Sequence, residues 1–250
     1  MLRAFAEGHI FGEPFGEGTP KVIWLHGWGR SSADFRVAGE TLAARGVASL
    51  ALDLPGFGAS PAPDSPMGAR GYAELIGPVV REATHGEPYV LVGHSFGGRI
   101  AAVLGSRGEA GLRGLVFAGA PLVARTTSPR RTPWPYRLVR TAAKWHLVSP
   151  GRLEAAKRKY GSVDYRNATG VMRDVLVATV NETYEAELAA ITTPSIFVWG
   201  ANDSDVPPNI AQRAAALVRR TPIVREIQGC GHLVPRDGTV ALVEATVELL

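Results

Sequence analysis

The chain has few of the features that mark a secreted or membrane-embedded protein. Its single cysteine, Cys230, excludes an internal disulfide bond and fits a reducing compartment. No apolar run approaches the roughly 18 residues that a transmembrane helix needs. The first residues also lack the apolar segment of a secretory signal. We therefore expect a cytoplasmic protein without a transmembrane segment.

Motifs for metals, phosphates and nucleic acids are also missing from the sequence. No His or carboxylate pair has metal-ligand spacing, and there is no glycine-rich phosphate loop of the P-loop kind. The sequence thus predicts neither a metal nor an organic cofactor. Nucleic acid is not an expected partner, because no recognised binding module is present and the chain is acidic outside one basic segment.

What the chain does contain is enough apolar material for a large folded core. Hydrophobic residues make up 46% of its 250 residues and charged residues 20%, which is typical of one large domain or a domain with a small insertion. Six short runs of β-forming residues are continuously apolar, as in a parallel sheet buried on both faces. They are 22–25, 47–52, 89–92, 114–118, 195–199 and 223–227.

Helical patterns separate these runs. The expected helices are 33–45, 72–84, 96–107, 208–219 and 238–250, and two weaker stretches, 4–5 and 10–15, are expected to form an antiparallel pair. Alternating strands and helices predict right-handed crossovers and therefore an α/β fold with a doubly wound, mostly parallel sheet. Pro78 predicts a kink or break in the second helix.

One interval, 122–189, has no strand signal and interrupts this alternation. We predict that it is an inserted helical cap, or lid, on a core made of residues 1–121 and 190–250. Between Leu122 and Val175 there are twelve Lys and Arg against three acidic residues, which leaves fifteen against twenty elsewhere. A basic cap favours an anionic partner such as an acyl carrier protein, a coenzyme A ester or an anionic lipid surface. A solvated cationic face is the alternative.

The third strong strand ends in a possible nucleophile turn. The pattern Gly93-x-Ser95-x-Gly97 lies where this strand passes into a helix. Such a turn strains the serine backbone and leaves no room for side chains two residues on either side. A serine-capped glycine turn is the alternative. His94 precedes the serine, and the N–H of Phe96 is a candidate oxyanion donor.

Three other strand ends contribute groups that serine chemistry needs. Gly27 and Trp28 follow the first strong strand, so that the Trp28 N–H is a second oxyanion donor and its indole a pocket wall. Asp203 and Asp205 follow the fifth strand and compete as the acid that orients a histidine. His232 follows the sixth strand. A nucleophile, a base, an acid and two N–H donors are the components of acyl transfer at serine.

The order serine, acid, histidine is that of the α/β hydrolases, and the chain resembles an α/β-hydrolase-fold serine hydrolase over nearly its whole length. This resemblance implies Ser95, Asp203 and His232 as the catalytic residues, since the family's acid stands three residues after the strand-ending glycine and four before a proline. It also implies that Asp53 belongs to a structural turn. His26-Gly27-Trp28-Gly29 further resembles the oxyanion segment of pimeloyl-acyl carrier protein methyl ester esterases.

The sequence therefore predicts a carboxylesterase-type serine hydrolase that acts on a small-molecule ester with an apolar acyl or alkyl group. Gly27, Trp28 and His94 are the predicted substrate-binding residues. A cofactor-free perhydrolase or acyltransferase on the same triad is an alternative. A second alternative, from outside enzymology, is a non-catalytic small-molecule receptor that keeps the pocket.

Overall fold

The computed structural model describes residues 1–124, 141–143, 145, 148, 149, 151, 152, 159 and 163–250. In this part of the chain the strands form one eight-stranded sheet with the order β1-β2-β4-β3-β5-β6-β7-β8. The strands are β1 (Arg3–Phe5), β2 (Ile10–Phe15), β3 (Val22–Leu25), β4 (Ser49–Asp53), β5 (Tyr89–His94), β6 (Leu112–Ala118), β7 (Ser195–Gly200) and β8 (Ile223–Ile227).

Strands β3 to β8 run parallel, whereas β1 and β2 pair antiparallel with each other and β2 pairs antiparallel with β4. The doubly wound, mostly parallel sheet and its antiparallel start are thus as predicted. Because β4 lies on one side of β3 and β5 on the other, the chain reverses its direction of winding beside β3. Ligands of open α/β sheets bind beyond the carboxyl ends of the strands at such a point.

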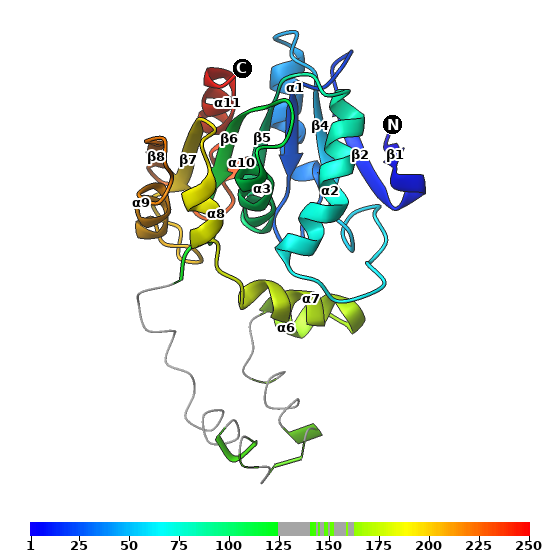
Figure 1. Ribbon diagram of the computed structural model, residues 1–250, viewed down its shortest axis with the longest axis vertical. Helices are drawn as coiled ribbons and strands as arrows, with labels where there is room; N and C mark the ends of the chain where they lie inside the picture. The colour runs from blue at the N-terminus through cyan, green and yellow to red at the C-terminus, as the bar shows by residue number, and fades with distance from the viewer. Residues whose placement is uncertain (125–140, 144, 146–147, 150, 153–158, 160–162) are drawn as a thin grey trace.

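Helices cover both faces of the sheet (Figure 1). The helical segments are η1 (Ala6–Gly8), η2 (Ser32–Phe35), α1 (Arg36–Ala43), α2 (Ala69–Thr84), α3 (Phe96–Arg107), α6 (Val163–Asn167), α7 (Gly170–Val180), α8 (Glu185–Ala190), α9 (Asn209–Ala215), α10 (Val234–Asp237) and α11 (Thr239–Glu248). Residues of α2, α3, α8 and α9 share one apolar core with the sheet. Residues of α1, α10 and α11 share the other.

The sequence predicted a kink or break at Pro78, and the break is absent, since α2 continues through this residue. Pro78 and Glu74, whose carbonyl loses its helical N–H partner, both lie on the exposed side of the helix. The unpaired carbonyl is therefore open to water, while the buried side of the same turn, with Ile76, Val79 and Val80, holds the helix on the sheet.

The carboxylate of Asp53 has the structural role that the resemblance implied. It lies at the end of β4 and accepts hydrogen bonds from the N–H groups of Ser32 (2.7 Å) and Ala59 (2.8 Å). These bonds fix two loops beside the carboxyl ends of the strands.

The predicted cap lies partly outside the described residues. Its described helices, α6 and α7, stand at one end of the core in Figure 1, whereas α8 packs against α3. Tyr184, just before α8, is fully buried and donates its N–H to the carbonyl of Leu122 (3.1 Å). The chain therefore returns to the core near Tyr184.

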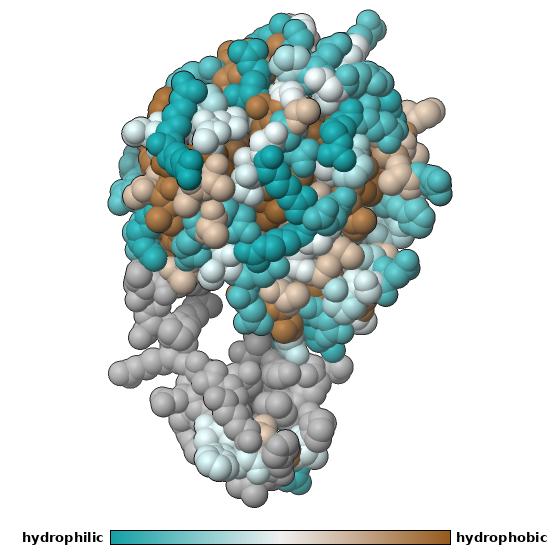
Figure 2. All heavy atoms as spheres, viewed as in Figure 1, coloured by the Kyte–Doolittle hydropathy of each residue, from teal (hydrophilic) through white to brown (hydrophobic). Residues whose placement is uncertain are grey.

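The face seen in Figure 2 mixes hydrophilic and apolar residues.

Candidate active site

Ser95 occupies a tight turn between β5 and α3. Its backbone has φ 49° and ψ −106°, a conformation that residues other than glycine seldom adopt. The Ser95 N–H donates to the carbonyl of Ala118 on β6 (2.9 Å), which ties the turn to the sheet. Strain of this kind persists where the surrounding structure enforces it, and it is concentrated at functional sites. The turn places the hydroxyl at the carboxyl end of the sheet.

Glycines on either side allow the turn to close. A Cβ atom at Gly93 would lie 2.5 Å from the carbonyl oxygen of Gly97, and one at Gly97 would lie 2.2 Å from that of Leu25. Both contacts are with backbone atoms, which cannot move aside as a flexible side chain does. The sequence requirement for glycine is therefore steric.

Gly97→Ala is expected to destabilise the fold by about 3 kcal/mol or more, because the new methyl group overlaps the backbone of β3. Urea unfolding should show a lower midpoint at an unchanged m-value. The matched control is Gly151→Ala, where a Cβ meets no atom of the described residues within 4 Å. Equal midpoints for the two variants would contradict this account of the turn.

His232 lies between β8 and α10 and bridges the serine and a carboxylate. Its Nε2 is 3.1 Å from Ser95 Oγ, and its Nδ1 is 2.8 Å from Asp203 Oδ2. A carboxylate only accepts, so Nδ1 carries the proton and Nε2 is free to accept the serine proton. The tautomer that a general base requires is thus set by Asp203.

The structure brings Asp203, and not Asp205, to the histidine. The Asp203 side chain is fully buried, and its second oxygen accepts the N–H groups of Asp205 (2.9 Å) and Val206 (2.7 Å). These bonds hold the carboxylate in place beside the histidine. Asp205 itself is exposed. Because both residues follow the same strand, their placement in the sequence left the two open, and the resemblance to the α/β hydrolases is what implied Asp203.

The two candidate oxyanion donors lie on neighbouring loops. Phe96 begins α3, and the Gly97 N–H donates to the carbonyl of His26 (3.0 Å), which joins α3 to the loop that carries Trp28. Among the described residues, neither the Trp28 nor the Phe96 N–H has a protein acceptor. Free N–H groups at a helix start are suited to binding negative charge.

A cavity of about 470 Å³ opens onto the Ser95 and His232 side chains. Gly27, Trp28 and His94 also line it, so the predicted substrate-binding residues lie at its wall. A smaller hollow of about 120 Å³ adjoins it beside Phe96 and Leu176. The Trp28 ring packs edge-on against Phe57 and Phe96, with centroids 5.0 and 5.6 Å away. The wall beside the serine is therefore aromatic.

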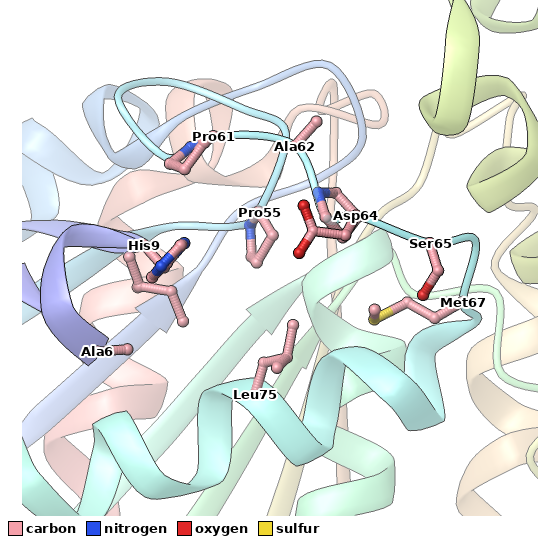
Figure 3. A pocket seen from close by; sticks show the side chains of 11 residues that line it. Ala6, His9, Pro55, Pro61, Ala62, Asp64, Ser65, Met67 and Leu75 are labelled. Atoms are coloured by element: carbon pink, nitrogen blue, oxygen red, sulfur yellow. The ribbon is translucent and has the colours of Figure 1, made fainter.

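A separate pocket of about 230 Å³ lies between the start of β2, the loop after β4 and α2 (Figure 3). Pro55, Pro61, Met67 and Leu75 contribute apolar side chains to it. Neither Ser95 nor His232 lines this pocket, so the chemistry is assigned to the cavity at the carboxyl ends of the strands.

Two further histidines beside the site are buried and neutral. His26 accepts the Leu54 N–H at Nε2 (3.0 Å), and the Nε2 of His94 is 2.9 Å from the carbonyl oxygen of His232. Burial lowers the pKa of each to about 4.

These two histidines make the fold sensitive to acid. Between about pH 6.5 and pH 4 the unfolded chain binds protons at both that the folded chain does not. Stability is thus full above pH 6.5 and lost as the pH falls towards 4, by about 3 kcal/mol per group at most. His26→Gln removes one of the two groups, so urea unfolding across this range should show a shallower loss. An unchanged slope would contradict the assignment.

Asp164 on α6 is a cavity residue that sequence reasoning missed. Its side chain lines both the large cavity and the smaller hollow. Burial raises the pKa of its carboxyl, as does the nearby charge of Asp205. The sequence around Asp164 contains no catalytic or binding motif, so its place in the cavity wall is known only from the position of α6 in the structure.

Other sequence expectations concern metals, membranes and the cap. The described residues include no group of three His, Cys, Asp or Glu arranged to hold a metal ion. No described helix is long and apolar enough to cross a bilayer. Cys230 is buried, and burial raises the pKa of its thiol. Of nine basic residues at 130–159, only Arg152 and Lys159 lie within the described part.

An eight-stranded, mostly parallel sheet with a strained serine turn defines the α/β-hydrolase class. The chain belongs to the alpha/beta hydrolase family, whose model matches residues 22–245. A relative from Salmonella paratyphi B, named 2-succinyl-6-hydroxy-2,4-cyclohexadiene-1-carboxylate synthase, is 26% identical over 97% of each chain.

Solved structures share the fold at low sequence identity. An esterase from Exiguobacterium antarcticum has a TM-score of 0.73 and 21% identity, covering 99% of this chain and 97% of its own. Est816, described as an N-acyl homoserine lactone degrading enzyme, has a TM-score of 0.74 and 18% identity, covering all of both chains. A bacterial membrane phospholipase A has a TM-score of 0.75 and 20% identity, covering 99% and 85%.

Proposed function

We propose that the protein is a serine hydrolase that cleaves carboxylic esters through an acyl-enzyme. The observation that carries this proposal is the chain of hydrogen bonds from Ser95 Oγ to His232 and on to the buried Asp203. A serine, a correctly oriented imidazole and a carboxylate form the arrangement that activates a hydroxyl for attack on a carbonyl.

In the proposed reaction, Ser95 Oγ attacks the ester carbonyl while His232 Nε2 takes the hydroxyl proton. The tetrahedral oxyanion is stabilised by the N–H groups of Trp28 and Phe96. His232 then gives its proton to the departing alcohol, and the acyl-enzyme forms. Water attacks the acyl group, His232 takes a proton from it, and the acid leaves Ser95 as the hydroxyl is restored.

The aromatic wall and the small hollow beside Phe96 support an apolar acyl or alkyl group of limited size. A panel of p-nitrophenyl esters of increasing acyl length tests this. We expect kcat/KM to be highest among the short chains. A folded protein that turns over no ester of the panel would contradict the proposal and would favour a receptor that keeps the pocket.

A second candidate is the reaction named for the Salmonella relatives, whose product carries two carboxylates. It is supported by similarity along nearly the whole chain. Arg99 also supports it: this half-buried side chain lines the hollow beside Ser95, and its Nε is buried without a hydrogen-bond partner among the described residues. p-Nitrophenyl esters of succinic and butyric acid form a matched pair. Strong preference for the hemisuccinate, lost in Arg99→Met, would show that Arg99 binds a substrate carboxylate, as the second candidate requires.

The basic cap is proposed to recruit an anionic carrier or lipid, as its composition predicts. The support is the excess of Lys and Arg between Leu122 and Val175. Activity on a coenzyme A thioester that falls with rising salt, while activity on a neutral ester does not, would support recruitment.

A further inference from the structure

His94 connects the strand that carries the nucleophile to the loop that carries the base. It is the last residue of β5 and is 1% exposed. Its Nε2 is 2.9 Å from the main-chain carbonyl oxygen of His232. Because a carbonyl only accepts, Nε2 carries the proton and donates it. Two residues that are 138 positions apart in sequence are thereby joined.

The His232 loop is also held beside the end of β7, where the Asn202 N–H donates to the carbonyl of Cys230 (2.9 Å). Gly229 and Gly231 come just before the histidine, and Gly229 has a positive φ of 74°. The carbonyl of His232 also accepts the Val234 N–H (2.9 Å), which is a bond within the loop itself. The bond from His94 is therefore the one that ties this carbonyl to the sheet.

The surroundings of His94 favour a ring that is protonated at Nε2 and not at Nδ1. Its Nδ1 is buried and has no hydrogen-bond partner among the described residues. A Cβ atom at Gly27 would lie 2.8 Å from this nitrogen, so the space beside it is tight. The rings of His94 and His232 are 5.0 Å apart, and a second positive charge there would oppose the imidazolium that forms during catalysis.

We propose that His94 is a positioning residue that holds the His232 imidazole in line between Ser95 and Asp203 through its hydrogen bond to the His232 carbonyl. This proposal rests on the proposed function. It differs from the sequence prediction that His94 binds substrate: a binding residue affects KM, whereas a residue that aligns the base affects kcat.

The test compares two amide variants of equal polarity. In His94→Gln the amide nitrogen reaches the place of Nε2 and restores the donor, whereas the shorter side chain of His94→Asn ends near Nδ1. On a p-nitrophenyl ester, we expect His94→Asn to lower kcat by about 10- to 100-fold with KM within about two-fold of wild type. His94→Gln should recover most of the loss. Equal loss in both variants, no loss in either, or a change confined to KM would overturn the proposal.

A second measurement is independent of turnover, and its first part uses the wild-type protein alone. In the wild-type protein labelled with ¹⁵N-histidine, NMR should show His94 protonated at Nε2 and not at Nδ1 near neutral pH. The His232 Nδ1 proton, shared with Asp203, should give a protected downfield signal that weakens in His94→Asn and persists in His94→Gln. A His94 protonated at Nδ1 would refute the assignment.

The two measurements separate this proposal from the proposed function. If the wild-type protein hydrolyses no ester while the downfield signal depends on His94 as expected, the positioning role stands and the proposed function fails. If esters are hydrolysed and the downfield signal does not change when residue 94 is substituted, the proposed function stands and the positioning role fails.

Discussion

Ser95→Ala is expected to lower kcat for ester hydrolysis by about four to six orders of magnitude, because the acyl-enzyme cannot form without the hydroxyl. The Oγ atom of Ser95 lies 3.1 Å from His232 Nε2. The methyl side chain of alanine fits wherever the serine Cβ does, so the folded structure should be kept. Steady-state kinetics on the best ester of the panel, with thermal unfolding alongside, measures both effects.

The matched control is Ser106→Ala on the same helix, where the hydroxyl donates to the carbonyl of Val103 (2.7 Å). This variant should retain nearly full activity. If Ser95→Ala kept more than a few per cent of wild-type activity, the hydroxyl would not be the nucleophile.

Asp203→Asn is expected to lower kcat by about three to four orders of magnitude. The asparagine amide can present either its NH2 group or its oxygen to His232 Nδ1, so it no longer fixes the tautomer of the imidazole. It also carries no negative charge to stabilise the imidazolium that forms during the reaction. Because the side chain of residue 203 is buried, water cannot reach it and stabilise the imidazolium in place of the lost carboxylate. Kinetics of the purified variant on the same ester, with a pH–rate profile, checks this.

Asp205→Asn is the matched control for this prediction. Its side chain is exposed, and the bond it makes to Asp203 comes from its backbone N–H, which the substitution keeps. Activity should stay within a few-fold of wild type. An inactive Asp205→Asn beside a fully active Asp203→Asn would show that the acid was assigned to the wrong residue.

The sequence predicted those parts of the fold that depend on local pattern. Strands β3 and β8 and helix α3 lie at the predicted residues, because each is bounded by glycine, proline or polar turns. Helix α9 ends at Ala215, short of the predicted 219, and α10 was missed. Neither the early end of α9 nor a four-residue helix leaves a periodic signal in the sequence.

The candidate site also has residues that the sequence could predict and residues that it could not. Ser95, His232 and the two N–H donors follow strand ends in an order that the sequence displays, so they were predicted. The roles of His94 and Asp164 could not be, since each depends on which segment the folded chain brings beside it. His94 meets a carbonyl from the far end of the chain, and Asp164 reaches the cavity from α6.

Reaction with a fluorophosphonate tests the central claim most directly, because only an activated serine forms a stable covalent phosphonate under mild conditions. After incubation, intact-mass and peptide analysis should find one adduct per chain, located on Ser95, and no adduct in Ser95→Ala. A folded protein that stays unlabelled, or that carries the adduct on another residue, would contradict the account.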